Sequence, residues 1–345
     1  MIAAIFLISY SVFFFLGIII HECGHLVTGL LSGYKFLSFR ILSFVWHKAD
    51  GKLSFTVSKN RFILGQCLME PPKDEKDFKF ILYNLGGGLM NLAVAAVSAL
   101  FMAAFSDNRA IFAIALSSLM INALIGLTNL IPLVGILPND GYNVATALKS
   151  KAAKHGFFVM LRLNFEMAGG KRLRDYSASC FSGGNAGELS NFFVAYLLMC
   201  EAGRLYDLGF HAESAALLEK LIPAKLPLYY RNSCLSEILY YYLTDNPDLE
   251  KAKSLHGEKG MIKFLNIGIP SSIRIKTAYE FFVNKNLETS KSLFKTAQKA
   301  AETFENKGIS LMESNYLAEL ADLMAKSLPD GEEKSWCEVR VAEGK

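Results

Sequence analysis

Charged side chains are almost missing from three long stretches in the first half of the chain. Between Met1 and Tyr34 the only formally charged side chain is that of Glu22, and residues 80–106 and 110–139 contain none. Each stretch exceeds the roughly 20 apolar residues that a helix needs to cross about 30 Å of hydrocarbon. We therefore predict a multi-pass cell-membrane protein, with transmembrane helices at about residues 2–31, 80–105 and 110–136.

Other absences narrow the class of protein further. The N-terminus lacks the basic segment and the small-residue cleavage site of a secretory signal, so we expect the first helix to be retained. The six cysteines lack the spacing of a disulfide framework. A net charge of +4 is too small to indicate a nucleic-acid partner. After residue 149 no apolar run is long enough to span a bilayer, which indicates a soluble part.

Basic residues gather in two segments and predict the orientation in the membrane. Nine lysines and arginines lie within residues 35–79 and seven within 149–174, whereas the turn before the third helix offers only Arg109. Positively charged loops stay on the cytoplasmic side. We expect the N-terminus outside the cell, and the 33–79 loop and the C-terminal part in the cytoplasm, where the cysteines are reduced thiols.

Residues 36–70 have the pattern of β-structure. Residues 39–46 are rich in β-forming side chains, residues 49–51 signal a turn, residues 53–57 alternate with period two, and residues 62–69 form a third short run. We predict a small membrane-associated β-hairpin element here. A solvated loop with local hairpin structure is the alternative.

The C-terminal part has a helical and weakly repetitive pattern. Similar segments at residues 213–218, 250–255 and 290–293 each follow an aromatic helix and a turn, at a spacing near the tetratricopeptide period of about 34 residues. The fold prediction is a mainly α chain: a transmembrane core at 1–148, a connector at 149–188 and a soluble helical, tetratricopeptide-like domain at 189–345. An irregular helical bundle remains the alternative for this last part.

The sequence His21-Glu22-Cys23-Gly24-His25 lies inside the first apolar stretch and fits H-E-x-x-H. Positions i and i+4 of a helix lie one above the other, so both imidazoles can bind one zinc ion from the same face. Glu22 can then take a proton from a water molecule at the metal. Ionisable residues inside a membrane are costly and usually mark function.

A catalytic zinc site takes three protein ligands. The best remaining candidate is Asp140, the single acidic residue in the third apolar stretch and the break that follows it. His47, in the basic loop, is the rival third ligand. Cys23 lies two positions from His21, so it points to another side of the helix, and we expect it to pack as a small side chain.

Three sequence elements, in order along three predicted helices, resemble those of the site-2 protease family of intramembrane metalloproteases. They are His21-Glu22-Cys23-Gly24-His25; Gly88-Leu89-Met90-Asn91, similar to a G-x-x-x-N or G-P-x-x-N element; and Asn129-Leu130-Ile131-Pro132 with Pro138-Asn139-Asp140-Gly141, similar to N-x-x-P…L-D-G. The resemblance covers about residues 1–148. Two departures are the asparagine at 139, where the family has leucine, and the missing proline in the second element.

The resemblance implies a zinc metalloendopeptidase. It implies that His21, His25 and Asp140 bind Zn²⁺, that Glu22 is the general base, and that Asn91 and Asn129 contact substrate or the oxyanion. The expected substrate is a transmembrane regulator, pheromone precursor or signal-peptide remnant, with residues 36–70 guiding it. In the alternative interpretation, the membrane part is a catalytically retired anchor, and residues 189–345 recruit a cytosolic protein partner.

Overall fold

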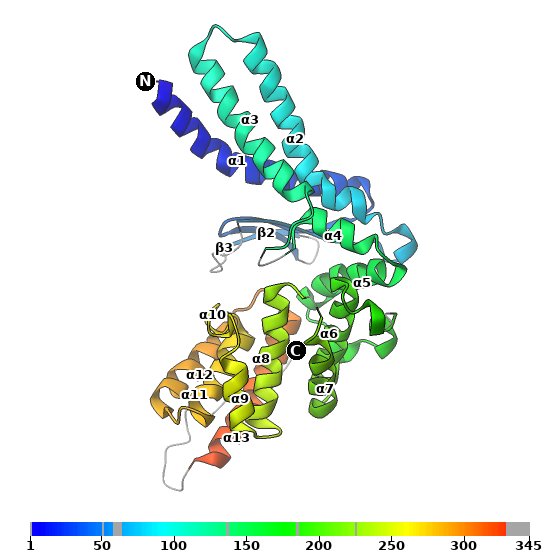
Figure 1. The fold of residues 1–345 in the computed structure, drawn as a ribbon, viewed down its shortest axis with the longest axis vertical. Helices are drawn as coiled ribbons and strands as arrows, with labels where there is room; N and C mark the ends of the chain where they lie inside the picture. The colour runs from blue at the N-terminus through cyan, green and yellow to red at the C-terminus, as the bar shows by residue number, and fades with distance from the viewer. Residues whose placement is uncertain are drawn as a thin grey trace. The chain divides into compact units, whose positions relative to one another are not determined.

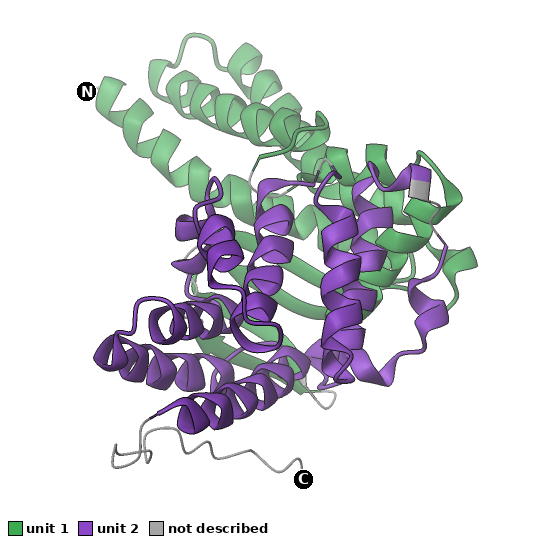
Figure 2. Cartoon of the chain, turned by 60° about the horizontal axis from the view of Figure 1, so that its bottom comes forward, with its two compact units in different colours: residues 1–165 green, residues 166–345 purple. Residues whose placement is uncertain are grey.

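The computed structural model describes residues 2–49, 52–57, 64–135, 138–183, 186–224 and 226–328. These residues form thirteen α-helices and four β-strands, so the prediction of a mainly helical chain is confirmed. The chain divides into two compact units, residues 1–165 and 166–345 (Figure 2). The boundary falls inside a helix of the segment predicted as a connector, residues 149–188.

Three helices of the first unit are long and apolar enough to cross a membrane: α1 (Ile2–Leu31), α2 (Phe80–Ala104) and α3 (Arg109–Leu130) (Figure 1). The prediction of three helices long and apolar enough to span a membrane is thus confirmed. The helix α3 ends at Leu130 rather than at 136, because Pro132 lacks an amide hydrogen and disfavours helical backbone in the residue before it. Residues 136 and 137 lie outside the described part.

Glycines set how closely these helices pack. A Cβ on Gly24 of α1 would lie 2.4 Å from the carbonyl oxygen of Gly86 in α2, and a Cβ on Gly88 would lie 2.6 Å from the side chain of Leu130 in α3. Small residues at such positions let helix backbones approach, which is how membrane helices associate. The run of three glycines at 86–88 therefore places α1 and α3 against neighbouring faces of α2.

A four-stranded antiparallel sheet follows α1, in the order β3-β2-β1-β4. Its strands are β1 (Lys35–Ile41), β2 (Phe44–Ala49), β3 (Lys52–Val57) and β4 (Gly65–Glu70). The run predicted as one strand at 39–46 is two, because Leu42 adopts a positive φ of 53° in a tight turn. The edge strand β4 packs against α1. Residues 50, 51 and 58–63, which include part of the predicted turn and third run, lie outside the described part.

Two further helices follow the break after α3: α4 (Asp140–Ala147) and α5 (Lys151–Ala168). Asn139 caps α4, since its side-chain oxygen accepts a hydrogen bond from the backbone N–H of Tyr142. The same oxygen accepts from the N–H of Leu133, and the amide group donates to the carbonyl oxygens of Thr128 and Ile131. One side chain thus joins the end of α3 to the start of α4.

The second unit consists mainly of helices packed in pairs. They are α6 (Phe192–Asp207), α7 (His211–Leu221), α8 (Leu228–Thr244), α9 (Leu249–His256), α10 (Met261–Leu265), α11 (Pro270–Phe282), α12 (Leu287–Glu302) and α13 (Lys307–Ser327). The turns predicted near residues 209, 246 and 285 separate α6 from α7, α8 from α9, and α11 from α12. The pairing agrees with the predicted helical pattern, and the assignment to tetratricopeptide repeats stays a prediction.

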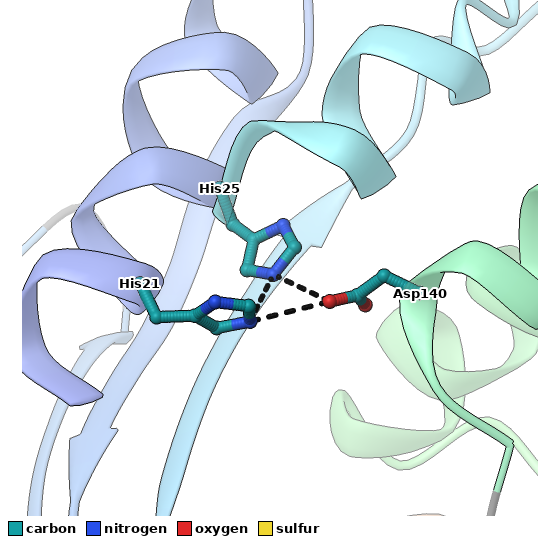
Figure 3. A group of neighbouring side chains, drawn as sticks. All are labelled: His21, His25 and Asp140. Carbon is teal, nitrogen blue, oxygen red and sulfur yellow. Dashed lines mark hydrogen bonds and ion pairs between the residues drawn. The ribbon is translucent and has the colours of Figure 1, made fainter. Parts of the chain in front are cut away.

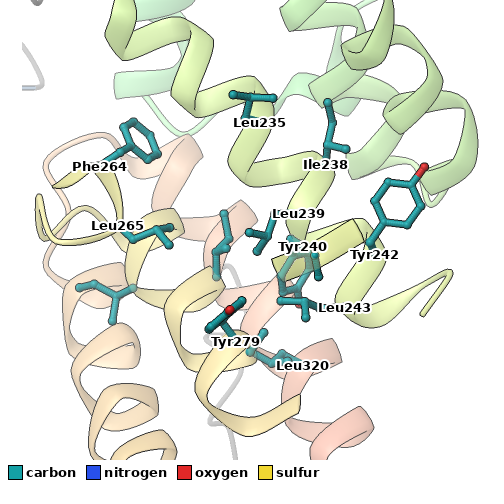
Figure 4. Packing of buried hydrophobic residues seen from close by; sticks show 14 of the residues in the cluster. Leu235, Ile238, Leu239, Tyr240, Tyr242, Leu243, Phe264, Leu265, Tyr279 and Leu320 are labelled. Carbon is teal, nitrogen blue, oxygen red and sulfur yellow. The ribbon is translucent and has the colours of Figure 1, made fainter. Parts of the chain in front are cut away.

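The core of this unit is built from leucine, isoleucine and aromatic side chains, many of them on α8 (Figure 4). Arg274 of α11 is fully buried within it and forms ion pairs with Glu313 at 2.8 Å and Glu237 at 3.1 Å. Its guanidinium also lies 4.2 Å from the ring centre of Tyr240. Removing one partner of such a buried group typically costs about 3–5 kcal/mol, so these contacts tie α8, α11 and α13 together.

Candidate metal centre

His21 and His25 lie one turn apart on α1 and point toward the first residue of α4, Asp140 (Figure 3). The Nε2 atoms of the two imidazoles are 3.1 Å apart. The Oδ2 atom of Asp140 is 3.2 Å from Nε2 of His21 and 3.3 Å from Nε2 of His25. Within the described residues, these three form the one group of His, Cys, Asp and Glu side chains able to hold a metal ion.

The other nitrogen of each imidazole is already engaged. Nδ1 of His25 lies 2.8 Å from the backbone carbonyl oxygen of Tyr83, and Nδ1 of His21 lies 3.0 Å from Oδ1 of Asn91. Both partners are oxygen acceptors, so each Nδ1 carries a hydrogen. In the neutral imidazole that a metal requires, each Nε2 would then present its lone pair.

Two imidazole Nε2 atoms and one carboxylate oxygen meet within little more than 3 Å of one another. Three such atoms in close contact repel each other unless a proton or a metal cation lies between them. All three residues are also mostly shielded from solvent, and both histidines are buried. The arrangement therefore fits a metal ion held by His21, His25 and Asp140.

Glu22 is buried beside this group, on the same helix. Its carboxylate accepts a hydrogen bond from the backbone N–H of Cys67 in β4. A Cβ on Gly65, also in β4, would lie 2.6 Å from Oε1 of Glu22, so the missing side chain lets the strand reach the carboxylate. The edge strand thus holds Glu22 in place, and the main chain of this strand lies close to Glu22, the candidate base.

Gly87 of α2 leaves room at the histidines. A Cβ at this position would lie 2.5 Å from Nε2 of His25 and 2.8 Å from Nε2 of His21. Real Cβ atoms do not approach other atoms so closely, so any other residue here would occupy the space in front of both ligand atoms. This glycine therefore belongs to the candidate site itself, whereas its two neighbours serve helix packing.

Two buried side-chain amides form a hydrogen-bonded chain that ends at Nδ1 of His21. Asn91 of α2 donates one amide hydrogen to the carbonyl oxygen of Gly17 and the other to Oδ1 of Asn122 in α3, both at 2.9 Å. Asn122 donates in turn to the carbonyl oxygen of Ser118. Asn91 and Asn122 are both fully buried. The network links the three long apolar helices to one candidate ligand.

Not every residue singled out in the sequence lies in this group. Asn129 is in the last turn of α3, where its amide donates to the carbonyl oxygen of Ile125. His47 is on β2, in register with Ser38 and Ser54, and is outside the metal group. Asn91 uses both amide hydrogens and its oxygen within the protein, which favours positioning of His21 over the predicted contact with substrate. Substrate contact by Asn91 or Asn129 stays a prediction.

No protein-family model matches the chain, and no similar protein was found among curated proteins or solved structures. The resemblance to the site-2 protease family therefore depends on the three sequence elements alone.

Replacing Asn91 by alanine should weaken metal binding roughly 10- to 100-fold, the usual effect of removing a hydrogen-bond partner of a ligating histidine. The change leaves Nδ1–H of His21 without its acceptor. Titration of purified protein against a competing chelator measures the affinity. Asn84→Ala is the matched control, because Asn84 is buried on the same helix and, among the described residues, its amide donates to the Phe80 carbonyl oxygen alone. Equal affinities of the two variants would refute a positioning role for Asn91.

Proposed function

We propose that this chain is an intramembrane zinc metalloprotease of the site-2 protease type. The observation that carries the proposal is a buried His-His-Asp group, with a glutamate directly beside it, on a helix of membrane-spanning length. Its substrates would be peptide bonds in or near transmembrane segments of membrane-bound regulators, pheromone precursors or signal-peptide remnants. An intact Glu22 in this position favours an enzyme over a retired membrane anchor.

Zinc suits the group better than other common metals. Two imidazole nitrogens and one carboxylate oxygen are typical ligands of catalytic zinc, which keeps a fourth position open. Ligands at about 2.0–2.1 Å in a tetrahedron lie about 3.3 Å from each other, and the three separations here are 3.1, 3.2 and 3.3 Å. A zinc ion bound there would polarise the scissile carbonyl and make a water molecule more acidic.

The residues of the chain divide the remaining work. Glu22 takes a proton from the attacking water and passes it to the leaving amine nitrogen. Water is thereby added across the peptide bond, which gives a carboxyl group and an amine, and Glu22 returns to its carboxylate form. The bond from the Cys67 N–H orients the carboxylate for both transfers. The amide network keeps His21 in the tautomer that presents Nε2.

The sheet would supply an extended substrate with partners. A helix shields its peptide bonds, so a transmembrane substrate must unwind before attack. Gly65 and Cys67 of β4 lie next to Glu22, and the main chain of Cys67 is already bonded to Glu22 and to the Tyr83 hydroxyl. An unwound segment that pairs with the sheet by main-chain hydrogen bonds at other positions would be placed near the base. Residues 189–345 contain helical pairs of the kind that bind proteins, and they would recruit a protein partner or regulate cleavage.

The test combines metal content with cleavage in a membrane. Full-length protein reconstituted in liposomes should contain about one zinc per chain and should cut a synthetic transmembrane peptide in a chelator-sensitive way. Asp140→Ala should lose most of the zinc and all measurable cleavage, whereas His47→Ala should retain both. If Asp140→Ala kept its zinc and activity and His47→Ala lost both, the third ligand would be His47 and not Asp140. A zinc-free wild-type protein would overturn the proposal.

A further inference from the structure

A groove of about 460 Å³ lies at the N-terminal end of α2, and its lining does not include His21, His25 or Asp140. Most of its lining is apolar. Leu82, Leu85 and Leu89 follow one another along one face of α2, at the spacing of successive helical turns. Leu82 and Leu89 are both nearly half exposed. The groove is therefore an open apolar channel along a helix of membrane-spanning length.

Two lysines provide the polar part of this groove. Lys79 immediately precedes α2, and Lys154 comes from α5, so the two lysines line the groove from different elements. Neither ammonium forms an ion pair with any residue that the structure describes, and the groove lining contains no acidic side chain in that part of the chain. The groove thus combines two unneutralised positive charges with an apolar channel.

An aromatic cluster joins the two elements that carry these lysines. Phe78 packs against Phe80 with ring centres 5.4 Å apart, and against Phe157 and Phe158 of α5 at 5.7 and 5.2 Å. Lys154 lies one turn before these two α5 phenylalanines, on the same helix face. The cluster therefore fixes α5 beside the start of α2, so the pairing of the two lysines follows from packing.

We propose that this groove binds an anionic phospholipid. The phosphate lies between the ammonium groups of Lys79 and Lys154, and one acyl chain lies along Leu82, Leu85 and Leu89. Charge complementarity selects the headgroup, because the described lining of the groove holds two lysines and no acidic side chain, and such a lining attracts an anion. The apolar channel continues the exposed surface of α2, which would face the hydrocarbon, so a lipid reaches it without leaving the bilayer. This proposal is independent of peptide hydrolysis.

Native mass spectrometry of the full chain, released from phosphatidylcholine nanodiscs with or without added phosphatidylglycerol, tests the proposal. Wild-type protein should retain phosphatidylglycerol in preference to phosphatidylcholine. The double variant Lys79→Gln/Lys154→Gln should bind it roughly ten- to thirtyfold more weakly, as expected for two lost lysine contacts. The matched control Lys73→Gln/Lys149→Gln removes two exposed charges outside the groove lining and should behave as wild type.

A second variant tests the acyl-chain part without altering charge. Leu85→Trp fills the channel and should lower phosphatidylglycerol retention while both lysines remain. All variants are compared by gel filtration to establish that they fold. Wild-type retention in either groove variant, or an equal loss in the control, would overturn the proposal. Displacement of the lipid by inorganic phosphate alone would also overturn it, because the groove would then be a site for free anions.

Discussion

Glu22→Gln is expected to abolish peptide cleavage while leaving the metal in place. Glutamine matches glutamate in size and still accepts the hydrogen bond from the Cys67 N–H, but it cannot take a proton from water. A general base typically contributes about 10²- to 10⁴-fold to the rate, so cleavage of a transmembrane peptide should fall by at least that factor. Zinc content, measured by mass spectrometry of the purified protein, should equal that of the wild type.

Glu70→Gln provides the matched comparison. Glu70 lies on the same strand that contacts Glu22, but its carboxylate pairs with Lys35. The same carboxylate-to-amide change should therefore leave both cleavage and metal content near their wild-type values. If Glu22→Gln cut the peptide as fast as the wild type, the base would be another group. If it lost the metal, Glu22 would be acting as a ligand.

Gly87→Ala should remove the metal almost completely. The added methyl group would lie 2.5 Å from Nε2 of His25 and 2.8 Å from Nε2 of His21. Neither ring can turn aside freely, because Tyr83 and Asn91 hold their Nδ1 atoms. Alanine favours a helix over glycine by about 1 kcal/mol, so the loss cannot be attributed to a weaker α2. Affinity for zinc should drop by more than about tenfold.

Two further glycine variants separate a steric effect at the metal from a general effect on packing. Gly88→Ala would meet the side chain of Leu130 at 2.6 Å and the carbonyl oxygen of Gly126 at 3.1 Å, both in α3, rather than the histidines, and we expect it to retain most of the metal. Gly187→Ala has no atom within 4 Å of its new Cβ and should match the wild type. Equal loss in Gly87→Ala and Gly88→Ala would show that α2 packing, and not space at the ligands, is responsible.

The grouping of His21, His25 and Asp140 was accessible from the sequence because charge is so scarce in the apolar stretches. His21 and His25 needed only the helical spacing of four residues, and Asp140 needed only the rarity of acids near the third stretch. The lengths of α1 and α2 also followed from hydrophobicity alone. The end of α3 was misplaced at residue 136, since the apolar pattern continues past Pro132 while the helix does not.

The groups that position these ligands were beyond sequence reasoning. Glu22 is bonded to the main chain of Cys67, and His25 to the main chain of Tyr83. Every residue has the same main-chain groups, so a sequence does not indicate which of them will act as partners. Asn122 carried a usable signal, a polar side chain in an uncharged stretch, but its partner depends on how α2 and α3 pack. The split of one predicted strand into β1 and β2 depends on the positive φ of Leu42, and a leucine in a sequence does not predict a positive φ.

The order of the ligands along the chain has a consequence for biosynthesis. His21 and His25 enter the bilayer with the first helix to be synthesised, and Asp140 follows only after the third. The amides that steady His21 arrive on the second and third helices. A ribosome-bound, half-inserted chain therefore contains the histidines and Glu22 but lacks the carboxylate that completes the centre. On the function proposed above, such a nascent chain would stay inert toward neighbouring proteins at the insertion machinery until its three apolar helices and Asp140 have come together.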